Sequence, residues 1–185
     1  MKAVIVYYSQ TGFTCRYAQW LAEALGCDCV PFNRRTKVKL DDYDVLIFGS
    51  GLSAGKIRQL SWFKESMATR EGRKKIVFAV GAMPREATEA VEKMFAQNFS
   101  SEQRNQFELF YLQGGLSYEK LSFPERLVMR MMCAVLRRKK RTPDEEGMVR
   151  MIEKSFDATD RSAIAPIVEA AGGVEDDEDS PGEKA

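Results

Sequence analysis

Apolar runs of strand length alternate with segments of helical periodicity along most of this chain. The runs predict strands over residues 3–8, 27–32, 44–49, 75–81 and 107–113. Apolar positions at helical spacing predict helices over residues 14–25, 58–69, 85–97 and 160–171. The runs at 45–48 and 76–80 are apolar on both faces, which is typical of parallel strands covered by helices on either side. The pattern therefore predicts an α/β fold with a doubly wound parallel sheet, in which the short connection 34–43 is an abbreviated helix or a loop.

Four turns rich in small residues follow predicted strands. They cover residues 9–14, 50–55, 81–84 and 114–118. In an open parallel sheet, ligands bind at the carboxyl ends of the strands, where the strand order reverses. Small residues let backbone N–H and C=O groups approach a flat ligand closely. The candidate contacts in the later turns are Ser50, Gly51, Leu52, Ser53, Ala54, Gly81, Ala82, Gly114, Gly115 and Leu116.

The first turn has the features of a phosphate site. It consists of Ser9, Gln10, Thr11, Gly12, Phe13 and Thr14. Gly12 permits a tight turn, the three hydroxyl groups can donate hydrogen bonds to phosphate oxygens, and the next helix presents unpaired N–H groups at its start. None of the six residues is charged. The simpler interpretation is an ordinary turn with a Ser or Thr cap.

Composition excludes several kinds of chemistry. The chain has no His, so imidazole bases, His metal ligands and His-activated nucleophiles are excluded. The four Cys residues lack CxxC spacing, which argues against a zinc site and favours a reducing cytoplasm. No apolar run reaches the 18 residues of a membrane span. Any chemistry therefore has to come from a cofactor, and no metal site is predicted.

The pattern Ser-x-Thr-Gly-x-Thr at residues 9–14 resembles the FMN-phosphate loop of the flavodoxin family. The resemblance covers roughly residues 1–171. It implies a five-stranded sheet of order 2-1-3-4-5 with FMN at the ends of the first and third strands. By this resemblance residues 9–14 hold the phosphate, residues 50–54 flank the isoalloxazine ring, and Gly81, Ala82 and residues 114–116 line its other edges. The implied function is that of an FMN-dependent redox protein, an electron carrier or an oxidoreductase.

The turn at 114–118 and the basic segment after it are most similar to the flavodoxin-domain branch that includes menaquinone-dependent protoporphyrinogen oxidase. That branch implies a quinone, porphyrinogen or redox protein as partner. One difference from ordinary flavodoxins is that residues 50–55 and 81–85 contain no aromatic side chain to stack on the flavin. Phe13, Trp62 and Tyr118 are the candidates for that role. A less covered ring would be open to a substrate, which favours catalysis.

Residues 120–141 contain eight basic residues and one acid around a largely apolar stretch. A basic amphipathic helix can lie on an anionic membrane surface. It can equally pack its apolar face on the sheet while Arg and Lys stay solvated. Nucleic-acid binding fits less well, because no aromatic residues interleave with the basic run. The first alternative predicts a cytoplasmic protein in peripheral contact with the inner membrane face.

The rest of the chain completes the predicted domain organisation. Residues 142–145 have the pattern of a capping box and open a predicted extra helix over residues 146–154, so the domain spans residues 1–173. Residues 174–185 are strongly acidic and predict a disordered tail.

Three competing functions can be compared with the sequence. A phosphate loop of nucleoside-triphosphate enzymes is excluded because Gly55-Lys56 is followed by Ile57. A phosphoacceptor domain is excluded because the first strand does not end in acidic residues. A flavin-free interaction module that docks a partner or membrane through residues 120–141 stays open.

Overall fold

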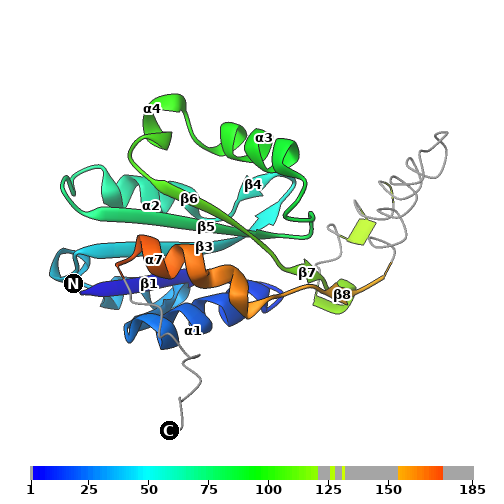
Figure 1. The fold of residues 1–185 in the computed structure, drawn as a ribbon, viewed down its shortest axis with the longest axis horizontal. Helices are drawn as coiled ribbons and strands as arrows, with labels where there is room; N and C mark the ends of the chain where they lie inside the picture. The colour runs from blue at the N-terminus through cyan, green and yellow to red at the C-terminus, as the bar shows by residue number, and fades with distance from the viewer. Residues whose placement is uncertain (1, 121–125, 128–130, 132–153, 173–185) are drawn as a thin grey trace, which may run out of the picture.

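The computed structural model describes residues 2–120, 126, 127, 131 and 154–172. Its main sheet has five parallel strands in the order β2-β1-β3-β5-β6 (Figure 1). These strands are β1 (Ala3–Tyr8), β2 (Asp28–Pro31), β3 (Val45–Ser53), β5 (Lys74–Gly81) and β6 (Glu108–Gln113). Counted as parallel strands, this is the order 2-1-3-4-5. The α/β fold and its doubly wound sheet are therefore confirmed.

The register of the sheet brings the carboxyl ends of the strands to one edge. Tyr8 of β1 pairs with Ser50 of β3, Gly51 pairs with Val80 of β5, and Gly81 pairs with Gln113 of β6. Each predicted turn begins within a residue or two of these pairs. The four turns are consequently neighbours in space although more than 100 residues separate the first from the last.

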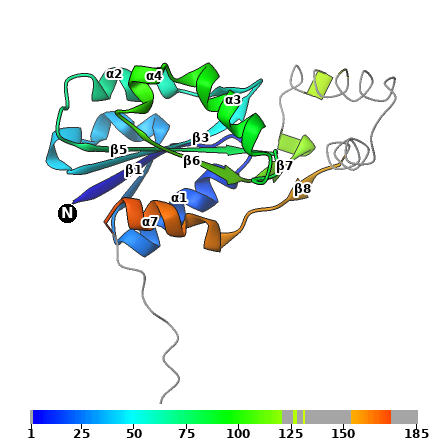
Figure 2. The ribbon, with the colours of Figure 1, turned by 45° about the horizontal axis from the view of Figure 1, so that its top comes forward.

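Helices cover both faces of the sheet (Figures 1 and 2). One face carries α1 (Phe13–Leu25), the 3-10 helix η4 (Arg161–Ile164) and α7 (Ala165–Ala170), and the other carries α2 (Leu60–Met67), α3 (Thr88–Asn98) and α4 (Ser101–Arg104). Alternate residues of each strand contribute to the two cores, as Val4 and Val6 do on the α2 side and Ile5 does on the α1 side. Burial on both sides explains why these strands are apolar throughout rather than alternating.

Several short helices and a short strand add detail to the predicted order of elements. The connection after β2 forms two 3-10 helices, η1 (Phe32–Lys37) and η2 (Leu40–Asp42). The strand β4 (Lys56–Ile57) turns back along the end of β3 in antiparallel pairing. The predicted helix 160–171 is divided into η4, whose start Asp160 caps by accepting from the Ser162 N–H, and α7.

The chain leaves the sheet after β6 and returns to it through a second, two-stranded sheet. Gly115 and Leu116 form β7, which pairs antiparallel with β8 (Phe156–Asp157). The 3-10 helix η3 (Tyr118–Lys120) follows β7. The predicted helices over 120–141 and 146–154 lie largely outside the described residues, although Arg126, Leu127 and Met131 are helical. The predicted tail at 174–185 also lies outside them. Within the described ranges, every helix is too short or too polar to cross a bilayer.

Candidate functional site

The first turn joins β1 to α1 through a glycine in the left-handed region. Gly12 has φ 104° and stands at the N-cap of α1, where its N–H donates to Ser9 Oγ at 3.1 Å. The first amides of an α-helix have no acceptor within the helix, so those after Gly12 are available to an anion. No acidic residue lies in the first turn of α1 to oppose one. The local geometry therefore suits a phosphate.

The two threonines of this turn have different surroundings. Thr11 is partly exposed, whereas Thr14 is only 3% exposed and lies beside β3. A Cβ atom added to Gly51 would lie 3.6 Å from Thr14 Oγ1. The first turn of α1 is thus packed against the end of β3.

The turn after β3 contains a serine whose hydroxyl group is already engaged. Ser50 is fully buried, and its Oγ donates to the Arg58 carbonyl at 2.7 Å. Arg58 in turn donates through Nη2 to Ser53 Oγ at 3.0 Å. Ser50 thereby holds β4 against β3, and Gly51, Leu52, Ser53 and Ala54 form the accessible part of the turn. Ala54 has φ 47°, an uncommon conformation for a residue with a side chain.

The turn after β5 is fixed by a tyrosine from β6. Tyr111 Oη donates to the Met83 carbonyl at 2.9 Å. Burial raises the pKa of Tyr111, although this hydrogen bond opposes the shift, so the phenol stays a neutral donor. A Cβ atom on Gly81 would lie 2.8 Å from both Tyr111 Oη and Leu52 Cδ1. Glycine is needed at position 81 because two side chains approach its backbone, and Ala82 follows it at the same edge.

The turn after β6 lies under a side chain of the first turn. The Gly114 N–H donates to the Gly81 carbonyl at 2.7 Å, and the Ala158 N–H donates to the Gly114 carbonyl at 2.7 Å. A Cβ atom on Gly114 would lie 3.1 Å from Phe13 Cβ, and one on Gly115 would lie 2.9 Å from Phe13 Cζ. Phe13 therefore packs over both glycines. Leu116 is buried in the β7–β8 pair.

Trp62 and Tyr118, two of the candidates for stacking on the flavin, lie in different parts of the fold. Trp62 lies on α2, where its ring is 5.2 Å from that of Phe32 and 6.0 Å from that of Phe48, so it belongs to an aromatic cluster in one core. Tyr118 lies in η3, beyond the last turn, and is partly exposed. Phe13, the third candidate, packs over Gly114 and Gly115.

A hollow of about 380 Å³ opens beside the first turn. Its lining comes from the first turn, from α1, and from β7 and β8 with their flanking residues. The lining residues are Thr11, Gly12, Phe13, Arg16, Leu116, Ser117, Lys120, Ser155, Phe156 and Asp157.

Two basic residues of this hollow were missed as site residues by the sequence analysis. Lys120 Nζ donates to the Thr11 carbonyl at 3.0 Å. Arg16 Nη1 donates to Asp157 Oδ2 and to Thr159 Oγ1, both at 2.6 Å. The sequence pattern assigned Lys120 only to the basic segment 120–141 and not to the phosphate site. Arg16 gave no sequence signal, because its partners are more than 140 residues away.

Asp157 is the acidic member of this hollow. Burial raises the pKa of its carboxyl group, but hydrogen bonds from Thr159 and the Arg16 guanidinium outweigh burial and hold that pKa below its ordinary value. Asp157 is consequently ionised and paired with Arg16. The pair is half exposed, at 44% for each side chain.

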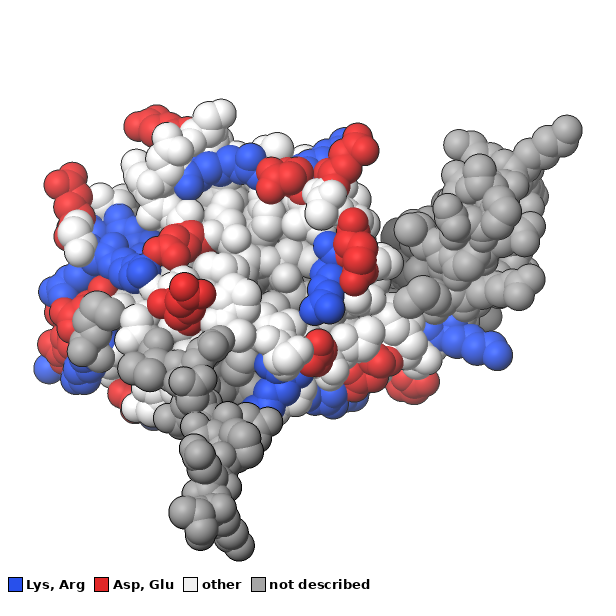
Figure 3. Space-filling view, viewed as in Figure 1, with Lys and Arg blue, Asp and Glu red and all other residues white. Residues whose placement is uncertain are grey.

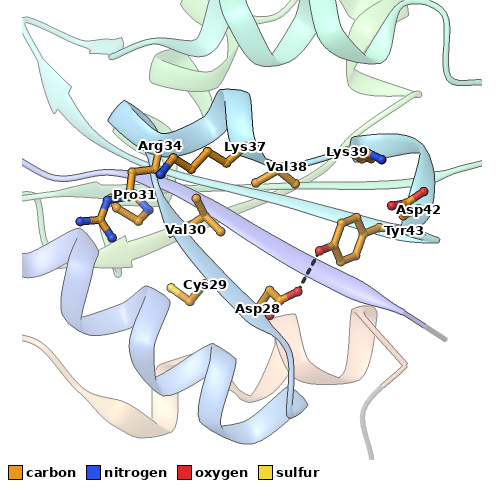
Figure 4. Close-up of a pocket in the computed structure, with 10 residues that line it drawn as sticks. All are labelled: Asp28, Cys29, Val30, Pro31, Arg34, Lys37, Val38, Lys39, Asp42 and Tyr43. Carbon is orange, nitrogen blue, oxygen red and sulfur yellow. Dashed lines mark hydrogen bonds between the residues drawn. The ribbon is translucent and has the colours of Figure 1, made fainter.

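A larger hollow of about 430 Å³ runs along the outer edge of β2 (Figure 4). Arg34, Lys37 and Lys39 line one side of it, and Tyr43 Oη donates across it to Asp28 Oδ2 at 2.8 Å. None of the predicted contact residues lines this hollow. It belongs to the edge of the sheet rather than to the carboxyl ends of the central strands.

Comparison with known proteins identifies the family. A profile described as the flavodoxin domain matches residues 4–143, which is most of the chain. The chain belongs to the flavodoxin domain family. Among curated protein sequences, none matches this flavodoxin-domain chain.

Solved structures include several distant flavodoxin-like neighbours. A WrbA-like flavodoxin from Agrobacterium tumefaciens has 16% identity and a TM-score of 0.43, with 75% of this chain and 99% of that chain covered. A flavoprotein in complex with FMN from Lactobacillus acidophilus has 14% identity and a TM-score of 0.43, covering 60% and 91%. A flavodoxin from the domain Archaea has 15% identity and a TM-score of 0.38, covering 83% and 100%. At these values the family assignment rests on the sequence profile.

Family membership supports FMN as the cofactor, and the first turn fits its phosphate. The fit comes from the positive φ of Gly12, from the start of α1, and from the Thr11 hydroxyl and Lys120 ammonium groups at the same hollow. All of these groups are hydrogen-bond donors or positively polarised, as a phosphate dianion requires.

Proposed function

We propose that this flavodoxin-domain protein binds FMN and uses it to transfer electrons between a reduced donor and an acceptor. The observation that carries the proposal is the meeting of four small-residue turns at one sheet edge, with the Gly12 turn and the start of α1 among them. Bound FMN would supply the one- and two-electron redox chemistry that the chain's own side chains lack. The protein's residues would bind the phosphate, orient the ring and adjust its potential.

The contributions of the turns differ by chemistry. The hydroxyl and amide groups of residues 9–14 would hold the phosphate, because ionised acceptors strengthen hydrogen bonds. The backbone groups at Gly51, Leu52, Gly81 and Ala82 would face the edge of the ring, where hydrogen bonds shift its redox potential. Ser50 would act indirectly, since its hydroxyl group holds the β3–β4 turn in place.

Titration of the purified apoprotein with FMN, followed by quenching of flavin fluorescence, tests the proposal. We expect saturable binding with one FMN per chain and a yellow complex. Absence of binding at any FMN concentration would contradict the proposal and favour the flavin-free interaction module.

The acceptor we propose is a quinone, and a porphyrinogen is a candidate donor, which would be oxidised as the flavin is reduced. Support comes from the absence of aromatic residues in the turns at 50–55 and 81–85, which leaves the ring open to a flat substrate. Stopped-flow reoxidation of the reduced, FMN-loaded protein by menaquinone analogues, with oxidised cytochrome as a comparison acceptor, tests this choice. Faster reoxidation by the quinone is expected. Equal rates with all acceptors would favour a general electron carrier.

Peripheral membrane contact through residues 120–141 belongs to the same proposal. Leu127 and Met131 both have helical backbone and are 50% and 62% exposed. Exposed large apolar side chains in a segment rich in basic residues suit an anionic lipid surface. On the face displayed in Figure 3, basic and acidic side chains of the described residues are interspersed rather than gathered into an area of one sign.

Co-sedimentation with vesicles of phosphatidylglycerol tests the membrane contact. The protein should pellet with the vesicles, and a variant with residues 137–141 changed to Gln should stay in the supernatant. A third variant, with Leu127 and Met131 changed to Ser, separates the apolar from the electrostatic contribution. Equal recovery of all three proteins in the supernatant would contradict membrane contact.

A further inference from the structure

We propose that Lys120 is a phosphate-binding residue, supplied to the uncharged first turn by a distant part of the chain. This inference rests on the proposed function and deepens it. It assigns to Lys120 the discrimination between phosphorylated and unphosphorylated flavin. The phosphate loop itself contains no charged residue, so a dianion bound there would otherwise meet only hydroxyl groups and backbone dipoles.

The position of Lys120 is the first support. Its Nζ donates to the Thr11 carbonyl at 3.0 Å and lies 3.5 Å from the position of a Cβ atom on Gly12. The ammonium group is thus at the rim of the turn, next to the start of α1. An ammonium has three donors, so Lys120 can keep the bond to Thr11 and still donate to a phosphate oxygen.

The anchoring of η3 is the second support. Lys120 follows β7, which pairs with β8, and the Tyr118 N–H donates to Ser155 Oγ at 3.0 Å. The Glu119 carboxylate accepts from Ser155 Oγ at 3.0 Å and from Ser117 Oγ at 3.1 Å. These bonds join the outgoing and returning segments at the residues that flank Lys120, so its backbone is held beside the turn before any ligand arrives.

The stem formed by β7 and β8 is itself fixed to α1. Tyr17 Oη donates to the Gln113 carbonyl at 2.6 Å and accepts from the Asp160 N–H at 3.0 Å. Arg16 binds Asp157 and Thr159 from the same helix. Because α1 carries both these anchors and begins at the first turn, the segments that lead to and from Lys120 are bound to the same helix as that turn.

The balance of charge in the hollow is the third support. Its charged lining residues are Arg16, Lys120 and Asp157. Arg16 is paired with Asp157, so those two charges largely offset each other. Within the described lining, Lys120 therefore supplies the positive charge that no carboxylate of the same hollow offsets.

Binding of two ligands to the same proteins tests the inference. FMN and riboflavin share the ring and the ribityl chain and differ in the phosphate. We would measure their Kd values by fluorescence quenching for the wild type, Lys120→Met, Lys120→Arg and the control Lys93→Met. Lys93 is an exposed lysine of α3, on the opposite face of the sheet from α1. Each FMN titration would be repeated at low and high salt.

We expect Lys120→Met to raise the Kd for FMN about tenfold, as loss of a charge-assisted hydrogen bond would. Its Kd for riboflavin should stay within about twofold of the wild type. Lys120→Arg should retain most of the FMN affinity, and Lys93→Met all of it. The salt dependence of FMN binding should be weaker in Lys120→Met, because one phosphate–cation attraction is missing.

Other outcomes overturn the inference in distinguishable ways. Equal weakening of FMN and riboflavin binding would mean that Lys120 only supports the fold of the turn. An unchanged FMN Kd in Lys120→Met, with wild-type FMN binding intact, would refute the role of Lys120 while leaving the proposed function in place. If the wild type bound neither ligand, the proposed function would fail and this inference would fail with it.

Discussion

The two hollows of this flavodoxin-domain protein are similar in size and both contain charged side chains, yet only the one beside the first turn includes the start of an α-helix. The hollow along β2 measures about 430 Å³ and the one beside the first turn about 380 Å³. Along β2, the basic groups are at the ends of long side chains from η1 and the segment after it (Figure 4). Beside the first turn, the donors include a helix start and short side chains on a fixed backbone.

The proposed site is therefore argued from backbone geometry rather than from volume or from the number of cations. Flexible lysines and arginines lose side-chain entropy when they bind a ligand, whereas amides at a helix start are already oriented. The Gly12 turn combines both kinds of donor, because Lys120 reaches a backbone that is positioned in advance.

Removing the hydroxyl donors of the first turn should produce the largest change in FMN affinity. Thr11→Ala and Thr14→Val should each raise the Kd for FMN about tenfold or more, because each removes a hydrogen bond to a charged oxygen. As the matched control, Lys37→Met and Lys39→Met in the β2 hollow should leave the Kd unchanged. FMN titration of the four variants provides the measurement. A larger loss in the lysine variants would place the phosphate in the β2 hollow instead.

Two glycine substitutions should separate backbone strain from ligand binding. Gly12 has φ 104° and Gly26 has φ 58°, and a Cβ atom on Gly26 would meet nothing within 4 Å. Changing either residue to Ala should lower the free energy of unfolding by about 1–2 kcal/mol, since L-residues are disfavoured at positive φ. Urea denaturation would measure this loss. Only Gly12→Ala should also weaken FMN binding, and equal FMN affinity of the two variants would contradict the role of the Gly12 turn.

Breaking the Arg16–Asp157 ion pair should give the smallest effect, a small loss in the free energy of unfolding. At pH 7, Asp157→Asn should lower the free energy of unfolding by less than about 1 kcal/mol, because the pair is half exposed and screened by solvent. The pKa of Asp157 is lower in the folded protein, so its contribution is present above the unfolded pKa and is lost as pH falls through the folded pKa. Urea denaturation of both proteins at pH 7 and at about pH 3 should show the difference shrinking. A difference independent of pH would exclude an ionic contribution.

The strands could be predicted from sequence because burial on both faces gives them continuous apolar runs. Residues 76–80 are an example, with Val77 and Ala79 in one core and Ile76, Phe78 and Val80 in the other. The predicted strand 44–49 was too short, because β3 continues through small residues to Ser53. The two-residue strands β4, β7 and β8 could not be predicted, since their formation depends on tertiary pairing rather than on local pattern.

The candidate site was predictable where it depends on backbone and less so where it depends on side chains from afar. The glycines at 12, 81 and 114 marked the turns, and the register brings those turns together. The burial of Ser50 against Arg58 gave no local signal. The contacts of Lys120 with Thr11 and of Arg16 with Asp157 join residues 109 and 141 positions apart, which no sequence periodicity can reveal.

The most direct test of the central claim is an NMR titration of ¹⁵N-labelled protein with FMN, with riboflavin as the comparison ligand. The claim is that the start of α1 and the Gly12 turn hold the phosphate. We predict that the amide signals of Gly12, Phe13 and Thr14 shift with FMN and shift much less with riboflavin. Equal shifts with both ligands, or shifts confined to the β2 hollow around Arg34 and Lys37, would contradict the claim.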